Sequence, residues 1–156
     1  MWSHLPQSVP IPKSCVTSVR EPFVSIEQTR ASIIAFERDW EKKRYGIFAL
    51  EILESGQLIG FAGLSEPNFL PEIMPAVEIG WRLSRAAWRK GYATEAARAA
   101  LNFGFTILGL PEIVSIYQVA NEASGRIVQK LGMKFDRETI DPSCGRRVRV
   151  FRTSGK

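Results

Sequence analysis

The segment 88–95, Trp-Arg-Lys-Gly-Tyr-Ala-Thr-Glu, combines residue types that suit the binding of a polyanion. Arg89 and Lys90 supply positive charge. Gly91 lets the main chain approach a bound group closely, and Ala93 adds no bulk. A helix that begins here presents backbone N–H groups without intrahelical partners, and its dipole favours negative charge. A basic turn with one glycine ahead of a helix is also common without a ligand, so these residues alone leave both interpretations open.

Two common phosphate-binding motifs are excluded in this segment. The P-loop ends in Gly-Lys-Ser/Thr, whereas the order here is Lys90-Gly91. The dinucleotide fingerprint needs three spaced glycines, whereas Gly91 stands alone between Gly80 and Gly104. An anion bound at this turn would therefore be held in another way.

Histidine and cysteine chemistry is also restricted. The single histidine, His4, and the two cysteines, Cys15 and Cys144, cannot assemble a structural zinc site. A catalytic triad is not expected from a histidine so close to the N-terminus. We therefore expect no metal, and chemistry done by carboxylates, hydroxyls and backbone amides. The sequence has no long apolar run, and the residues after Met1 do not form a secretory signal peptide. These features predict a cytoplasmic protein without membrane partners.

Positive charge exceeds negative charge, with a formal net charge of +5. That balance suits a nucleic acid, an anionic cofactor such as a nucleotide or coenzyme A, or solubility alone. A second basic cluster, which lacks the interleaved aromatic residues of single-strand binders, consists of Arg146, Arg147, Arg149 and Arg152. Nucleic acid therefore stays an alternative and not the expected partner.

The apolar pattern predicts one domain over residues 25–156, preceded by an irregular, proline-containing arm over residues 1–24. A capping box at 25–28, Ser-Ile-Glu-Gln, opens the first helix. The predicted elements are a helix 25–42, a hairpin 45–53 and 58–64, a strand 76–83, a helix 93–108, a strand 113–119, a helix 121–131, and strands 133–137 and 148–152. This order predicts a mixed α/β sheet with one crossover near its middle.

The strand 76–83 positions the basic turn, and its side chains alternate between two faces. One face carries Glu78, Gly80 and Arg82, and the other carries Val77, Ile79, Trp81 and Leu83. The helix after the turn has an alanine-rich stripe and is expected to pack closely on the layer beneath it.

Residues 88–96 resemble the acyl-CoA turn of GNAT acetyltransferases, which has the general form Q/R-x-x-G-x-G/A. The resemblance is closest to the branch typified by ribosomal-protein alanine N-acetyltransferases, in which W-x-K-G-Y-A-T-E-A is usual. Three further segments fit that branch in order and spacing: Val-Glu-Ile-Gly-Trp-Arg-Leu at 77–83, Asn-Glu-Ala-Ser at 121–124 and Lys-Leu-Gly-Met at 130–133. The match extends from about Ser25 to Phe151.

This resemblance implies the GNAT fold, a central, partly splayed and mostly antiparallel sheet flanked by helices. It implies direct transfer of the acetyl group of acetyl-CoA to a primary amine, of a protein N-terminus or of a small molecule. The pyrophosphate would lie on the amides of 89–94, and the pantetheine arm between the strands that end at Leu83 and Val119. The implied cofactor-binding residues are Trp81, Leu83, Arg89, Lys90, Gly91, Tyr92, Ala93, Thr94, Asn121 and Ser124.

The resemblance also implies a base and an acid near the thioester. Glu78 is the candidate base, acting through a water, because it lies on the strand that faces the acyl end. Ser124 is the candidate acid, although many members use a tyrosine in this helix and here Tyr117 precedes it. The structural alternatives are a surface glutamate for Glu78 and helix capping for Asn121 and Ser124. Catalysis by proximity alone is a further alternative.

One departure from the branch concerns its opening strand. No segment like E-T-E-R-L-x-L-R precedes Pro22, so the sheet is expected to lack the usual first strand. Residues 14–19 of the arm could replace it, or the edge strand 45–53 could pair with a second subunit in a homodimer. The alternative function is a catalytically inactive module that binds CoA or nucleic acid.

Overall fold

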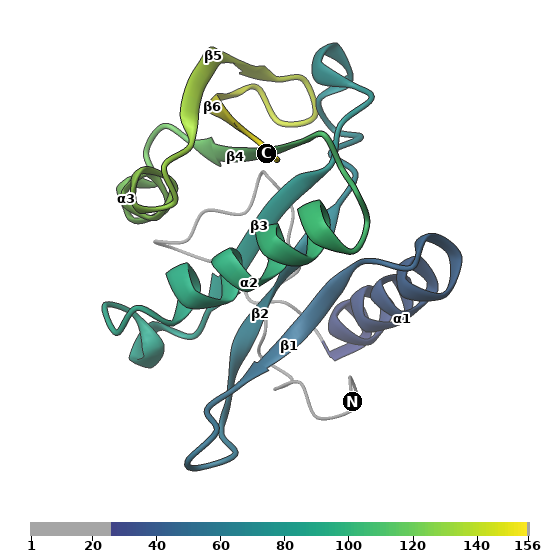
Figure 1. Ribbon diagram of the computed structural model, residues 1–156, viewed down its shortest axis with the longest axis vertical. Coiled ribbons are helices and arrows are strands. Elements are labelled where there is room, and N and C mark those ends of the chain that lie inside the picture. Colours follow the sequence, from purple (N-terminus) through teal and green to yellow (C-terminus); the bar gives the residue numbers. More distant parts are fainter. Residues whose placement is uncertain (1–25, 156) are drawn as a thin grey trace.

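The computed structural model describes residues 26–155, in which three helices and six strands follow one another in the predicted order (Figure 1). The elements are α1 Ile26–Lys43, β1 Ile47–Glu51, β2 Leu58–Ser65, β3 Glu78–Leu83, α2 Tyr92–Thr106, β4 Glu112–Gln118, α3 Glu122–Lys130, β5 Lys134–Asp141 and β6 Arg146–Ser154. Two short 3-10 helices are η2 (Pro71–Ile73) and η3 (Arg85–Ala87). The predicted arm 1–24, with its candidate strand 14–19, and Ser25 of the capping box lie outside the described residues. Within 26–155, no helix combines the length and the apolar composition that crossing a membrane requires.

The strands form one six-stranded sheet in the order β1-β2-β3-β4-β6-β5. Neighbouring strands are antiparallel except β3 and β4, which are parallel and connected through α2. The predicted mixed sheet with one crossover near its middle is therefore confirmed. Among the described strands, β1 is the outermost on its side. Pairing of this edge with the arm or with a second subunit stays a prediction.

β3 and β4 separate soon after they meet. Their ladder holds the single pair Glu78↔Val114, next to a bond in which the Val114 N–H donates to the Val77 carbonyl at 2.9 Å. From there β3 continues to Leu83 and β4 to Gln118 with no further β3–β4 pair. Main-chain groups on the facing edges therefore have no strand partner and are left for water or a ligand. The predicted splay of the sheet is confirmed.

Helices cover both faces of the sheet. Phe61 and Leu64 of β2 are three residues apart and so point to opposite faces. On the Leu64 face, α2 packs through Ala97 and Ala100, which are 0% and 2% exposed. On the Phe61 face, α1 packs through Phe36, whose ring centroid lies 5.7 Å from that of Phe61. The small side chains of α2 allow the close packing that the alanine stripe predicts.

The connection between β2 and β3, residues 66–77, is here called the η2 loop and is anchored at two points. Leu70 and Ile73 are buried against valines of β4 and β6. On the outside, Glu72 accepts hydrogen bonds from the Thr139 hydroxyl at 2.6 Å and from the Arg137 guanidinium at 3.2 Å. These contacts fix the loop against the second half of the sheet.

The last two strands are longer than predicted. The sequence predicts strands 133–137 and 148–152, whereas β5 extends to Asp141 and β6 begins at Arg146. The Asp141 carbonyl accepts from the Gly145 N–H at 2.7 Å, and its carboxylate accepts from the Ser143 N–H at 2.8 Å, which closes the turn. Because β5 is an edge strand, many of its side chains are polar, and the apolar pattern that marks a strand is weak there.

Candidate active site

The segment between β3 and α2 folds into a fixed turn. The Trp88 indole N–H donates to the Leu83 carbonyl at 3.0 Å, and the Arg85 guanidinium lies 5.5 Å from the centroid of the Trp88 ring. Arg89 and Gly91 then adopt φ angles of 62° and 81°, in the left-handed region. These two residues turn the chain into the first turn of α2.

The first turn of α2 presents hydrogen-bond donors. Gly91 is its N-cap and provides no side-chain cap, and the Glu95 N–H donates to the Gly91 carbonyl at 3.0 Å. The N–H groups of Tyr92, Ala93 and Thr94 therefore have no partner within the helix. A Cβ atom placed at Gly91 would meet no heavy atom of the described chain within 4 Å. Open space over three donors at the positive end of a helix fits an anion such as a pyrophosphate.

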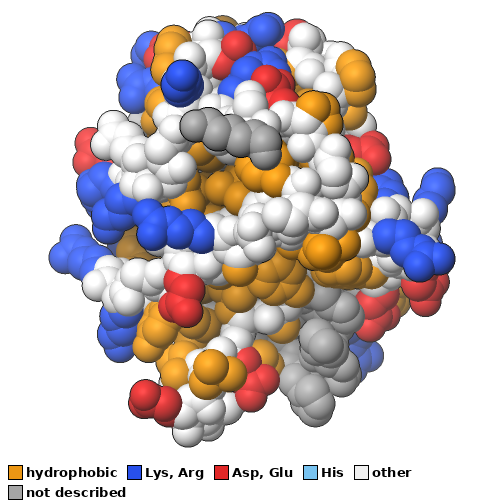
Figure 2. All heavy atoms as spheres, in the orientation of Figure 1, with side chains coloured by type: hydrophobic (Ala, Val, Ile, Leu, Met, Phe, Trp, Pro, Cys, Tyr) orange, Lys and Arg blue, Asp and Glu red, His pale blue; other side chains and the backbone are white. Residues whose placement is uncertain are grey.

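A pocket of about 340 Å³, which we call the turn pocket, lies between this turn and α3. Its cationic lining residues are Arg82, Arg89, Arg126 and Lys130. Figure 2 shows Lys and Arg side chains gathered over α3 and the start of α2, on the left of the view. The predicted cofactor residues that line the turn pocket are Trp81, Leu83, Arg89, Gly91, Tyr92, Ala93, Thr94, Asn121 and Ser124.

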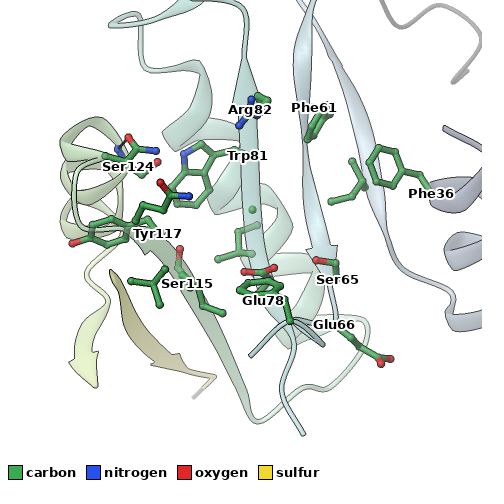
Figure 3. A pocket seen from close by; sticks show the side chains of 18 residues that line it. Phe36, Phe61, Ser65, Glu66, Glu78, Trp81, Arg82, Ser115, Tyr117 and Ser124 are labelled. Carbon is green, nitrogen blue, oxygen red and sulfur yellow. Dashed lines mark hydrogen bonds between the residues drawn. The ribbon is translucent and has the colours of Figure 1, made fainter. Parts of the chain in front are cut away.

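A second pocket, of about 290 Å³, contains Glu78 and is called the Glu78 pocket (Figure 3). Its wall includes Phe36 of α1, Phe61 of β2 and Phe69 of the η2 loop. Lys90, a predicted cofactor residue, is exposed and lines neither pocket. The residues that line both pockets are Trp81, Arg82, Asn121 and Ser124. The two pockets therefore meet beside the opening between β3 and β4, where groups bound in each could react.

Glu78 lies beside Ser65, its partner in the β2–β3 ladder. The Ser65 side chain points toward Glu78 and forms a hydrogen bond with it (Figure 3). Burial raises the pKa of Glu78 to about 8, and the Ser65 hydrogen bond opposes that rise. The carboxyl group is therefore mostly protonated at neutral pH and becomes a proton acceptor as the pH passes 8. A perturbed carboxyl group inside a pocket is typical of a functional site, although structural groups can also be perturbed.

The model of the acetyltransferase (GNAT) domain matches residues 14–134 of this chain. The chain belongs to the GNAT acetyltransferase family. Among its relatives is YoaA, an uncharacterised N-acetyltransferase of Bacillus subtilis, which is 32% identical over 114 residues. These residues make up 73% of this chain and 63% of YoaA, so the chain spans less than two thirds of that relative. The predicted membership of the GNAT superfamily is confirmed.

Solved GNAT structures share the fold. An acetyltransferase from Agrobacterium tumefaciens has a TM-score of 0.70 and 25% identity, over 83% of this chain and 72% of its own. The ribosomal-protein-S5-alanine acetyltransferase of Vibrio fischeri has a TM-score of 0.70 and 16% identity, over 92% of this chain and 80% of its own. The predicted mixed, helix-flanked sheet is thereby confirmed. The second likeness shows the fold alone, so membership of the ribosomal-protein branch stays a prediction.

Two hydroxyl groups near the opening are candidates for the acid of a GNAT acetyltransferase. Ser124 lines both pockets, and its N–H donates to the Asn121 side chain at 3.2 Å, which forms the predicted cap of α3. Tyr117 stacks on Phe151 with ring centroids 5.8 Å apart, and its hydroxyl is hydrogen-bonded to Arg149. That hydroxyl points away from Glu78 (Figure 3). Ser124 is therefore the better placed of the two.

The basic cluster on β6 is largely neutralised within the chain. Arg147 and Arg149 both pair with Glu138, the latter at 3.1 Å, and the Arg152 guanidinium lies 2.9 Å from the Asp136 carboxylate. Arginines held in this way offer less charge to a phosphate backbone. As for metals, residues 26–155 contain no group of three or more His, Cys, Asp or Glu side chains that could hold an ion.

Several lining residues escaped the reasoning from sequence. Ser65 faces Glu78 only through the register of the hairpin, and Phe69 enters the pocket from a loop, so neither carries a local signal. Arg126 and Lys130 could have been found, because Arg126 lies three residues after Ala123 and Lys130 lies four residues after Arg126. That spacing places all three on the side of α3 that faces the turn pocket.

Proposed function

We propose that this protein is an N-acetyltransferase that moves the acetyl group of acetyl-CoA directly to a primary amine. Acetyl-CoA would occupy the turn pocket and the amine the Glu78 pocket. The observation that carries the proposal is that the two pockets meet at the opening between β3 and β4. Direct transfer needs both substrates at one place at one time, and holding them in attack geometry by itself lowers the barrier.

The turn pocket suits two parts of the cofactor, its pyrophosphate and its amide-containing arm. The donors of residues 92–94, supported by Arg89, would bind its pyrophosphate. Trp81 and Leu83 lie on the part of β3 that has no β4 partner, and main-chain groups there would bind the amide-containing arm. When bound, acetyl-CoA supplies a thioester whose carbonyl carbon gains the amine nitrogen as the C–S bond breaks, so the amine loses a proton and the sulfur gains one.

Glu78 is the residue that we infer removes the amine proton, directly or through a water. An alkyl ammonium group, with a pKa of about 10, must be deprotonated before its nitrogen can attack. With its pKa raised to about 8, the Glu78 carboxylate is a stronger base than an ordinary glutamate. The base is competent only when ionised, so the rate should increase as the pH rises through about 8.

Ser124 is the residue that we infer returns a proton to the sulfur. Its position in the lining of both pockets supports this role. A serine hydroxyl is a weak acid, so we expect a smaller contribution than that of Glu78. The cap formed with Asn121 holds the first turn of α3, and Ser124 with it, beside the opening.

The finer resemblance, to ribosomal-protein alanine N-acetyltransferases, rests mainly on the turn 88–96 and the segments beside it. Most residues of these segments contribute to the turn pocket, where the cofactor would bind: residues 81–83, 88, 89, 91–94, 121, 123, 124 and 130. We infer that the chain is similar to that branch in how it would bind the cofactor. The acceptor is a separate question, because most of the walls of the Glu78 pocket come from other segments.

Turnover with acetyl-CoA tests the proposal. The full chain is mixed with acetyl-CoA and primary amines, including peptides with a free N-terminal alanine or serine, and thiol release and product mass are followed. We expect thiol release that depends on the amine and a product heavier by one acetyl group. Acetyl-CoA binding without turnover would point instead to an inactive CoA-binding module. RNA binding with a steep salt dependence and no effect of acetyl-CoA would point to a nucleic-acid-binding module.

A further inference from the structure

The charges of the Glu78 pocket restrict the amines that it can accept. Its lining holds two carboxylates, Glu66 and Glu78, and one guanidinium, Arg82. Glu66 is already engaged, because its Oε1 lies 3.4 Å from the Lys43 ammonium and accepts from the Tyr45 hydroxyl at 3.3 Å. A substrate with one ammonium group can pair with Glu78 once that carboxyl group is ionised. A second ammonium would meet, in the described lining, only a carboxylate that already has a cation, and burying an unpaired charge is costly.

Part of the wall around these charges is aromatic. Phe36 and Phe61 form a tilted pair of rings, and Phe69 and Trp81 add two more. Phe61 is only 1% exposed, so its ring position is fixed by packing. Aromatic walls favour an apolar substrate body through burial, at roughly 25 cal/mol per Å² of apolar surface. They also attract a single cation that approaches a ring face.

The outer wall of the pocket is in place before a substrate binds. Phe69 belongs to the η2 loop, whose neighbouring residues Leu70 and Ile73 are buried. Glu72 ties the same loop to β5 through Thr139 and Arg137. A wall fixed in this way selects substrates by shape and does not have to be ordered on binding.

We propose that the acceptor is a small primary amine with one positive charge on an apolar, aromatic body, as in an arylalkylamine, and not a polyamine or a peptide N-terminus. The pocket of about 290 Å³ lies just below the usual range for small-molecule sites, about 300–1,000 Å³. This inference rests on the proposed acetyl transfer. The reaction is unchanged: the amine nitrogen bonds to the acetyl carbon, the C–S bond breaks, the amine proton passes to Glu78 and the sulfur is protonated.

Competition among three acceptors tests this substrate class. The full chain is assayed with acetyl-CoA and phenethylamine, spermidine or a peptide with a free N-terminal alanine. We expect kcat/KM for phenethylamine to exceed the other two by about tenfold or more, since apolar fit discriminates on that scale. A higher kcat/KM for spermidine or the peptide would overturn the substrate class and leave acetyl transfer intact. Failure to acetylate any amine would overturn both proposals.

A variant of Lys43 tests the charge argument. Lys43→Met removes the cation beside Glu66 and leaves that carboxylate available to a second ammonium group. We expect the ratio of kcat/KM for spermidine to that for phenethylamine to rise by up to about fivefold, the scale of one new ion pair at a partly exposed site. Lys42→Met, at an exposed position of the same helix, serves as the control and should leave the ratio unchanged. An unchanged ratio in Lys43→Met would contradict the assignment of Glu66.

The aromatic wall is tested by shortening it. Phe69→Ala should raise KM for phenethylamine about tenfold and leave kcat close to that of the original chain, because the ring contributes binding and not proton transfer. Phe69→Leu, which keeps an apolar side chain, should recover part of the loss. A fall in kcat with an unchanged KM in Phe69→Ala would contradict a role for Phe69 in the wall.

Discussion

The two pockets that meet between β3 and β4 differ in what builds them. The turn pocket draws on one stretch of chain, residues 81–94, and on α3, and its predicted contacts are made largely by backbone N–H groups. The Glu78 pocket draws on α1, on every described strand except β5, on the η2 loop and on the start of α3, and its predicted contacts are made by side chains. A backbone site depends on a turn and a glycine, whereas a side-chain site depends on how distant elements pack.

This difference suggests a division of roles. Under the proposed function, backbone groups would recognise a cofactor that members of the family are expected to share, because the geometry of these groups follows from the turn itself. Side chains such as Phe69 can be exchanged without altering the fold, so they can define the acceptor. Changes on the two sides should therefore affect different kinetic parameters.

The largest effect is expected in the Glu78 pocket, from Glu78→Gln. This change removes the candidate base and should lower kcat by about 10²–10⁴-fold while leaving acetyl-CoA affinity near its original value. In the pH–rate profile of this variant, measured from about pH 6 to pH 9.5, the rise in rate around pH 8 should also be absent. Glu54→Gln, in the exposed turn between β1 and β2, is the matched control. Full activity of Glu78→Gln would assign catalysis to proximity alone.

On the backbone side, Gly91→Val places a branched side chain in the open space over the turn. We expect acetyl-CoA affinity to fall by about tenfold or more, and its stabilisation of the fold against heat to disappear. The φ of 81° also strains any side chain there, so a control with the same strain is needed. Gly109→Val, with a φ of 67° and no heavy atom within 4 Å of its Cβ, provides it. Equal loss of acetyl-CoA binding in both variants would show that the turn does not bind the cofactor.

Burial of Glu78 also predicts how stability depends on pH. Below about pH 4.5 the carboxyl group is protonated in both the folded and the unfolded chain. Between about pH 4.5 and pH 8 this group ionises only in the unfolded chain, so the free energy of unfolding of the original chain should fall, relative to that of Glu78→Gln, by up to about 1.4 kcal/mol per pH unit. Above about pH 8 the difference between the two proteins should level off. Urea unfolding of both proteins at about pH 5, 6.5 and 8 measures this difference. Parallel pH profiles would show that Glu78 is not desolvated.

The smallest effect is expected from Ser65→Ala. Loss of its hydrogen bond should raise the pKa of Glu78 further, so the rising limb of the rate should move to higher pH. At neutral pH the rate should fall about threefold to tenfold and return toward the original value at high pH. Ser55→Ala, in the exposed β1–β2 turn, is the control. A uniform fall in rate at every pH would indicate a structural defect instead.

The same contrast explains how far the sequence could predict this molecule. The turn, Gly91 and the cap at Asn121 are local patterns, so the order of elements and the position of the turn were accessible from spacing. The cofactor-binding residues around the turn were named through the family resemblance. The opening between β3 and β4 was implied only by the family resemblance. The Ser65–Glu78 pair and the ring of Phe69 depend on strand register and loop packing, which no local pattern encodes. The end of β5 was missed because an edge strand has a weak apolar signal, and the start of β6 was missed because its first two residues, Arg146 and Arg147, are exposed.

Hydrogen exchange on acetyl-CoA binding tests most directly the claim that the cofactor is held by the backbone of the turn pocket. The exchange of amides is compared in the full chain with and without saturating acetyl-CoA. We predict slower exchange at residues 92–94 and 81–83, and little change in the η2 loop, because only the first two groups would face the cofactor. Slower exchange in the η2 loop with no change at residues 92–94 would contradict this account.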